Sequence, residues 1–277
     1  MHHPEPVARR MYDLIEPICL VNFFSDEPNE AMAELGFRNY WDGYFAGRGG
    51  PLGLVPAEVV HAAFYSFAEG EVARHIPRVW ERTTPEAAYA ARLRGCVAAL
   101  RRILGDLADS PSLARAAELL TAAATSAPTE GRVMYAGLRT LLVPDEPVAR
   151  LWHVANMLRE HRGDGHIAAL VAHRIGGTES HVLSALDQGI HPATSFGRIH
   201  HLPKERLAEV MDGLRARGLL DGSGRFTDAG RETKASIESM TDELAEAPYD
   251  TLTSEKLERL VADLEPIAAA LNAVGSS

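Results

Sequence analysis

The helical spacing of apolar residues constrains the fold of this chain more than any other feature of its sequence. Apolar side chains return at intervals of three or four residues in segment after segment. The pattern is clearest after Pro203, at Leu207, Val210, Met211 and Leu214. This spacing places apolar side chains on one face of a helix, and prolines and glycines separate the segments. The sequence therefore predicts a mostly α protein.

The composition limits size and partners. The chain has 277 residues, 46% of them hydrophobic, so it can bury a sizeable core as one large domain or two smaller ones. Its formal charge of −10 disfavours broad binding to nucleic-acid phosphates or anionic membranes. No apolar run is long enough to span a membrane, and the first residues lack the apolar core of a signal peptide. We expect a cytoplasmic protein without a membrane partner.

Metal-binding and disulfide signals are weak. Cys19 and Cys96 are the only cysteines and form no CxxC motif, so neither a disulfide framework nor a thiolate zinc site is expected. His153, Glu160 and His166 could act as metal ligands, but no HxH or HExxH spacing is present. We predict no metal site, and the sequence indicates no particular cofactor.

Residues 126–131, Ser-Ala-Pro-Thr-Glu-Gly, have the composition of a linker. We predict an N-terminal helical domain at 1–125, a linker and packing segment at 126–150, and a C-terminal domain at 151–277. A weak internal repeat supports two halves, because the pairs Trp41 with Arg48 and Trp152 with Arg159 are each seven residues apart and precede glycine-rich breaks. Pockets favour the junction of such halves, so we expect a site there.

The stretch 151–167 combines an apolar helical pattern with a dense polar cluster around two glycines. We expect the glycines to end a helix after Arg162 and Asp164 to cap the next one. His153, Asn156 and Glu160 fall three and seven residues apart and would share one helix face. The cluster fits either a buried network of ion pairs and caps or a ligand site.

As a ligand site, the cluster would combine arginines for a carboxylate or phosphate, histidines as proton carriers and aromatic rings for stacking. In an enzyme, His153 or His166 would be the acid or base, Glu160 or Asp164 would orient it, and Arg48 and Arg159 would hold an anionic group. The candidate ligand-binding residues are Trp41, Tyr44, Arg48, Trp152, Asn156, Arg159, Arg162 and Asp164, and the candidate catalytic residues are His153, Glu160 and His166.

Two further expectations concern neighbouring segments. The glycines at 43, 47, 49 and 50 suggest that the backbone of this segment comes close to another group, which the sequence does not identify. In the helix expected from Glu86 to Leu104, the arginines at 92, 94, 101 and 102 lie off the apolar stripe and are predicted to form a solvated face.

Residues 204–245 resemble the second half of a MarR-type winged helix. The resemblance is carried by the helix ending in residues 214–220, the wing-like turn at 222–224, and Phe-Thr-Asp-Ala-Gly-Arg at 226–231. On these features and on segments 44–48, 151–153 and 158–166, nearly the whole chain is similar to an actinobacterial family of helix-turn-helix or MarR-like proteins. The resemblance implies a degenerate winged helix with a short two-stranded wing, and it implies no activity.

In winged-helix regulators the helix before the wing enters the DNA major groove. Here the candidate DNA contacts are Lys204, Arg206 and Arg225, with further basic groups at 198–204, whereas Glu209 and Asp212 on the same helix would repel phosphates. Nucleic acid is therefore a disfavoured partner, and a MarR-like regulator is the alternative function.

We favour a small-molecule-binding protein whose ligand carries an anionic group. An enzyme of specialised metabolism needs the same pocket as a ligand sensor, so the sequence does not separate the two. The sequence also leaves open whether the protein forms a homodimer. A third possible function is a protein-interaction module that kept the winged-helix fold and lost the ability to bind DNA.

Overall fold

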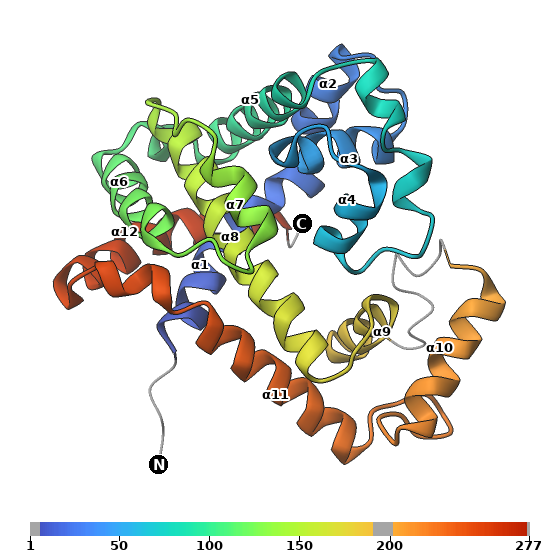
Figure 1. Cartoon of the computed structure of the whole chain (residues 1–277). Helices are drawn as coiled ribbons and strands as arrows, with labels where there is room; N and C mark the ends of the chain where they lie inside the picture. The colour runs from blue at the N-terminus through green and yellow to red at the C-terminus, as the bar shows by residue number, and fades with distance from the viewer. Residues whose placement is uncertain (1–5, 191–201, 276–277) are drawn as a thin grey trace. The chain divides into compact units, whose positions relative to one another are not determined.

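The computed structural model describes residues 6–190 and 202–275, and most of these are helical (Figure 1). The prediction of a mostly α protein is therefore confirmed. The chain divides into two compact units: unit 1 is Met1–Pro56, His75–Asp164 and Asp242–Ser277, and unit 2 is Ala57–Arg74 and Gly165–Thr241. Each unit joins separated stretches of chain, and the division into contiguous domains at 125 and 150 stays a prediction.

Helices and short 3-10 turns make up both units. The elements of unit 1 are α1 (Val7–Phe24), α2 (Asp26–Glu34), α3 (Tyr40–Gly49), η1 (Gly50–Leu52), η3 (Arg78–Glu81), α5 (Pro85–Leu104), η4 (Gly105–Asp109), α6 (Pro111–Ser126), α7 (Val133–Arg139), most of α8 (Pro147–Ala172), η7 (Ala247–Thr251) and α12 (Ser254–Gly275). Unit 2 holds α4 (Ala57–Phe64), η2 (Val72–Arg74), the end of α8, α9 (Gly177–Asp187), α10 (Lys204–Ala216) and most of α11 (Asp228–Leu244).

Local signals explain where several helices begin. Thr84 Oγ1 accepts a hydrogen bond from the backbone N–H of Ala87 at 3.2 Å, and Ser110 Oγ accepts one from Leu113 at 3.2 Å. A proline follows each of these caps at the first helical position, where its missing N–H costs nothing. These residue types therefore fix the starts of α5 and α6.

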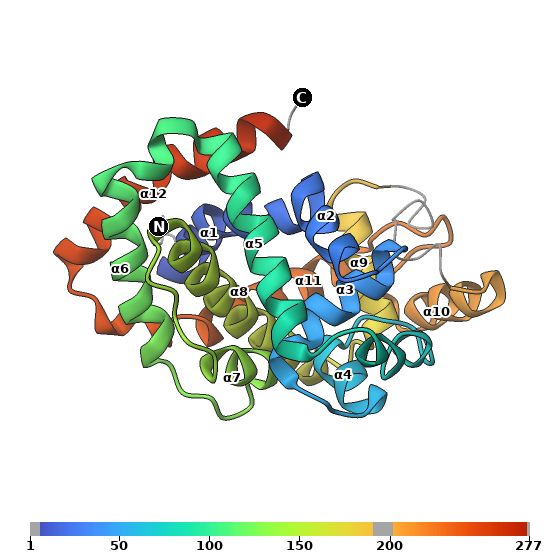
Figure 2. The same ribbon diagram turned by 90° about the horizontal axis from the view of Figure 1, so that it is seen from above.

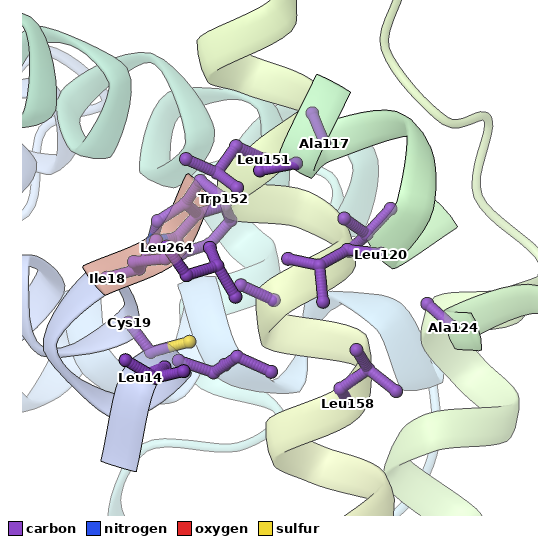
Figure 3. Packing of buried hydrophobic residues seen from close by; sticks show 14 of the residues in the cluster. Leu14, Ile18, Cys19, Ala117, Leu120, Ala124, Leu151, Trp152, Leu158 and Leu264 are labelled. Carbon is purple, nitrogen blue, oxygen red and sulfur yellow. The ribbon is translucent and has the colours of Figure 1, made fainter. Parts of the chain in front are cut away.

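The core of unit 1 forms where α1, α5, α6, α8 and α12 meet. Trp152 of α8 is fully buried, and Figure 3 shows it in one cluster with Ile18 of α1 and Leu264 of α12. Figure 2 shows α6 beside α12, and α5 beside α2 and α3. Alanines such as Ala117 on α6 have no long side chain to hold the backbones apart, so the helices of this core can pack closely.

Unit 2 has a smaller core of its own. It is built from Leu170, Leu183, Leu214 and Ile237, one from each of α8, α9, α10 and α11. The start of α9 lies directly against the segment after α4, because a Cβ on Gly177 would come within 2.0 Å of the Tyr65 carbonyl oxygen. Only glycine fits this contact.

Helix α8 runs unbroken for 26 residues, so the predicted helix end after Arg162 is wrong. Glycine inside a helix costs only about 1 kcal/mol relative to alanine, and tertiary contacts override such a cost. Asp164 does not cap a second helix either. Its carboxylate accepts hydrogen bonds from the backbone N–H groups of Met134 and Tyr135, at 3.3 and 3.0 Å, at the start of α7.

The wing in the described part of the chain is smaller than predicted. In place of two strands, a single antiparallel bridge joins Leu220 to Phe226. The Asp221 carboxylate accepts hydrogen bonds from the backbone N–H groups of Ser223 and Arg225, at 2.8 and 3.0 Å, and Gly224 takes a left-handed φ of 80°. Because α10 ends at Ala216 and α11 begins at Asp228, few residues remain beside this bridge for a longer ladder. None of the described helices is both long and apolar enough to cross a membrane.

Candidate functional site

The polar residues of α8 up to Asp164 belong to unit 1. His153 and Asn156 are buried in the first half of the helix, and Glu160 and Asp164 are buried further along. Partners come from α1, α3 and α5. We call the following residues the polar interior of unit 1: Glu16, Asn22, Arg48, Tyr89, Arg92, Trp152, His153, Asn156, Arg159 and Glu160.

Two arginines predicted to hold a ligand are instead paired with glutamates. Arg48 on α3 donates through Nε and Nη2 to the two oxygens of Glu160, at 3.1 and 3.0 Å, and through Nη1 to the Tyr44 hydroxyl at 2.9 Å. Arg159 donates through Nε and Nη2 to Glu16, at 2.7 and 3.0 Å. Burial opposes ionisation of Glu160, but the guanidinium groups of Arg48 and Arg159 outweigh it and lower its pKa to about 2. Glu160 is therefore a buried carboxylate anion.

The next turn of α8 is tied to its surroundings in the same way. Arg162 donates to Asp242 at 2.9 Å, and its guanidinium lies 4.2 Å from the centre of the Tyr12 ring. Burial raises the pKa of Asp164 to about 6, even though two backbone N–H groups stabilise its anion. Arg162 and Asp164 therefore serve packing contacts of unit 1.

The part of the polar interior around His153, in the first half of α8, contains buried polar atoms without hydrogen-bond partners. The Tyr89 hydroxyl lies 2.6 Å from His153 Nδ1, and burial lowers the pKa of His153 to about 4, so its ring is neutral at pH 7. On three neighbouring side chains of α8, four buried atoms find no hydrogen-bond partner among the described residues: Trp152 Nε1, His153 Nε2, and both polar atoms of the Asn156 side chain. Folded proteins rarely leave such groups unsatisfied, and a group of them often marks a functional site.

The remaining candidates divide between the two units. His166 belongs to unit 2, where its Nδ1 lies 2.9 Å from the Thr241 hydroxyl. Trp41 and Tyr44 belong to α3 of unit 1 and meet edge to face, with ring centres 5.4 Å apart. The close backbone approach suggested by the neighbouring glycines is to α5, because a Cβ on Gly50 would lie 2.7 Å from the Pro85 carbonyl oxygen.

Sequence reasoning missed Arg92. The prediction of a solvated face is correct for Arg94, Arg101 and Arg102 but wrong for Arg92, which is only 4% exposed. Its Nε donates to Asn22 Oδ1 at 2.9 Å, and its guanidinium lies 5.1 Å from the Trp152 ring centre. A signal was present, because Ala88 and Cys96 lie one turn away on either side, and such small residues mark a closely packed face.

A second missed cluster ties residues 75–78 to α3. The Asp42 carboxylate accepts hydrogen bonds from His75 Nδ1 at 2.7 Å, Arg78 at 2.9 Å and Asn39 at 2.6 Å. The His75 ring also stacks on Phe45, with centres 4.7 Å apart. Burial opposes ionisation of Asp42, but these hydrogen bonds, with the charge of Arg78, lower its pKa. The sequence offered no signal for this contact, because its partners lie more than thirty residues apart.

The cysteines lack the environment of a reactive or metal-binding thiol. Cys19 and Cys96 are buried and free. Burial raises the pKa of both thiols, that of Cys96 to about 12. The described residues contain no group of three or more histidine, cysteine or acidic side chains placed to hold a metal ion.

The candidate DNA contacts lie on unit 2. Lys204, Arg206 and Arg225 are exposed, and their role as DNA contacts stays a prediction. However, Arg206 pairs with Glu209 at 2.7 Å, and the neighbouring Arg215 pairs with Asp212 at 2.8 Å. The helix thus carries its own counter-charges. The basic groups expected at 198–201 lie outside the described residues.

Among the described residues of unit 2, the order α9, α10, short hairpin and α11 is consistent with a helix-turn-helix class of protein. A sequence model described as the Helix-turn-helix family matches residues 8–277. The chain belongs to this family. Comparison with curated proteins and with solved structures finds no match.

Proposed function

We propose that this helix-turn-helix family member binds a small molecule in the polar interior of unit 1, beside Trp152, His153 and Asn156. The observation that carries the proposal is the set of four buried, unpartnered polar atoms on these three side chains. Leaving a buried polar group unsatisfied costs roughly 1–3 kcal/mol. Three such residues within one turn and a half of α8 are better explained by a bound partner than by packing.

The hydrogen-bonding capacity of these four atoms limits the chemistry of the ligand. Trp152 Nε1 is a donor, the Asn156 amide is both donor and acceptor, and His153 Nε2 is either one, depending on the tautomer. A neutral group with donors and acceptors, such as an amide or a keto alcohol, would complement them. Arg48 and Arg159, first expected to hold an anionic group, support the walls of the site because Glu160 and Glu16 already occupy their guanidinium groups.

Binding is better supported than catalysis. A general acid or base works best when its pKa is near the operating pH, whereas burial lowers the pKa of His153 to about 4. Glu160 is held by two arginines, and Asp164 faces the backbone of α7 rather than His153. An enzyme of specialised metabolism would need a different proton carrier.

Native mass spectrometry of freshly purified full-length protein, followed by denaturation of the same sample, tests the proposal. We expect an added mass that is released on denaturation and is absent from Asn156→Leu, which removes two of the four atoms. Arg206→Ala, in unit 2, is the matched control and should keep the added mass. If the wild type carries no mass and no compound in a metabolite library raises its melting temperature, the proposal is wrong.

A MarR-like DNA-binding regulator is the second candidate. The family match and the order of elements in unit 2 favour it, whereas the ion pairs within α10 weigh against it. Lys204, Arg206 and Arg225 would contact phosphates, and a homodimer would place two copies about one DNA turn, roughly 34 Å, apart. In a salt-dependent DNA titration, Lys204→Ala and Arg225→Ala should each reduce the salt slope by about 1. Arg94→Ala, in unit 1, should leave the slope unchanged.

A further inference from the structure

We propose that unit 1 holds a site for a small monovalent anion, of the size of chloride or bromide, at the Arg92 guanidinium. The site adjoins the proposed ligand site, because the Arg92 guanidinium lies 5.1 Å from the Trp152 ring centre. It differs from that site in its lining, because its pocket is formed by residues of α1, α2, α3 and α5 and does not include Trp152, His153 or Asn156. Three independent observations carry the inference: the charge balance around Arg92, the lining of the pocket, and its size.

The charge balance leaves one cation without a partner. Arg48 is neutralised by Glu160, and Arg159 by Glu16. Arg92 is buried beside them, yet it forms no ion pair with any carboxylate in the described parts of the chain, and its contacts are the Asn22 side chain and the Trp152 ring. A buried charge is normally paired, so Arg92 calls for an anion.

The pocket beside Arg92 presents donors and no competing negative charge. Its described lining includes Asn22, Asn29, Met32, Tyr44 and Arg92 and contains no carboxylate. The Asn22 amide is oriented, because its Oδ1 accepts from Arg92 Nε. Its Nδ2 atom therefore remains as a donor, next to the guanidinium. Two N–H donors and a positive charge are what a small anion requires.

The size of the pocket selects the anion. Its volume is ≈ 20 Å³. A cavity of about 10–15 Å³ holds one water molecule. The pocket beside Arg92 is therefore large enough for a monatomic halide and too small for sulfate, phosphate or a sugar acid. Tyr40, one of the lining residues, is 41% exposed, so the lining of the pocket reaches the protein surface.

The test compares melting temperatures of the full chain in sodium chloride, sodium bromide and sodium gluconate at equal ionic strength. We expect chloride and bromide to raise the melting temperature saturably above its value in gluconate. Arg92→Met should lose this halide-specific rise, whereas Arg94→Met, on the exposed face of the same helix, should keep it.

Asn22→Asp provides a second variant in case Arg92→Met does not fold. The aspartate keeps the acceptor for Arg92 Nε and supplies the missing negative charge from within the chain. We expect this variant to be as stable in gluconate as the wild type is in bromide, with no response to halide. A crystal soaked in bromide should show an anomalous peak beside the Arg92 guanidinium.

Three results would overturn the anion site. One is a wild-type melting temperature that is equal in all three salts. Another is a halide response that Arg92→Met and Asn22→Asp retain. The third is the absence of a bromide peak at Arg92. None of these bears on the proposed ligand, which native mass spectrometry tests through Asn156.

Discussion

Arg48 on α3 and Glu160 on α8, 112 residues apart in sequence, form a two-point ion pair inside unit 1, with N–O distances of 3.1 and 3.0 Å. The planar guanidinium matches the carboxylate, and such paired contacts are among the strongest charged hydrogen bonds in proteins. From the sequence alone, both residues are candidates for a ligand site. In the structure each satisfies the other, so the pair joins two helices.

Removing one member of this pair should be more damaging than removing both. Glu160→Gln leaves the Arg48 charge buried without its partner, and we expect a loss of about 3–5 kcal/mol in the free energy of unfolding. Arg48→Met combined with Glu160→Leu should recover most of that loss, because neither charge of the pair is then left buried without the other. Urea unfolding measures the free energy of unfolding of the single and the double variant. Arg206→Ala breaks an exposed pair on α10 and should change stability by less than about 0.5 kcal/mol. Equal losses in the single and double variants would contradict this account.

Stability should fall as the pH drops from 7 to 4.5. Burial lowers the pKa of His153 and of His161 from 6.5 to about 4, so each ring is neutral when folded and takes up a proton more readily when unfolded. Their contribution is complete above pH 6.5 and is lost progressively as the pH falls to about 4, amounting to roughly 3 kcal/mol for each ring.

Asp164 acts in the opposite direction. Its pKa rises from 3.8 to about 6, so its contribution is complete below pH 3.8 and is lost as the pH rises through 6. Two histidines outweigh one aspartate, so the net slope should be positive. The free energy of unfolding, measured by urea between pH 4.5 and 7, checks this. His153→Gln should remove most of the slope, because Asp164 offsets most of what the remaining histidine contributes. A flat wild-type profile would refute the assignment.

Two glycines inside helices of unit 1 should respond to alanine in opposite ways. A Cβ at Gly163 would meet only a Glu160 oxygen at 3.7 Å, so Gly163→Ala should stabilise the protein by roughly 1 kcal/mol through helix propensity. A Cβ at Gly95 would lie 2.4 Å from the Pro28 Cα, so Gly95→Ala must separate α5 from α2 and should destabilise it. Thermal melts of both variants measure the difference. Destabilisation by Gly163→Ala would show that the position needs glycine for another reason.

The helical fold could be predicted because its signals are local. Thr84 and Ser110 cap helices that proline begins, and the apolar spacing after Pro203 marks α10. The same local reasoning failed at Gly163, because tertiary packing maintains a helix across a residue that disfavours it only weakly. The winged-helix resemblance indicated a wing, but not that α10 and α11 would leave room between them for only a single bridge.

The candidate site was less predictable because its contacts are long-range. The shared face of His153, Asn156 and Glu160 follows from helix geometry, whereas the Glu16 partner of Arg159 is 143 residues away. Arg92 was assigned to solvent because it lies off the apolar stripe of its helix. Its burial could have been inferred only from the small residues one turn away on the same face, and the Asp42 contact with His75 had no signal at all.

The two buried thiols should be unreactive in the folded protein. Burial raises the pKa of Cys96 from 9.0 to about 12, which lowers its thiolate fraction about a thousandfold, and the pKa of Cys19 is raised further. We expect iodoacetamide at pH 8 to modify both cysteines only after urea unfolding. Arg206→Cys adds an exposed thiol to the same protein, and mass spectrometry should show it modified at once under native conditions. If Cys19 or Cys96 reacts as fast as that exposed thiol, the packing between α1 and α5 opens far more readily than their burial implies.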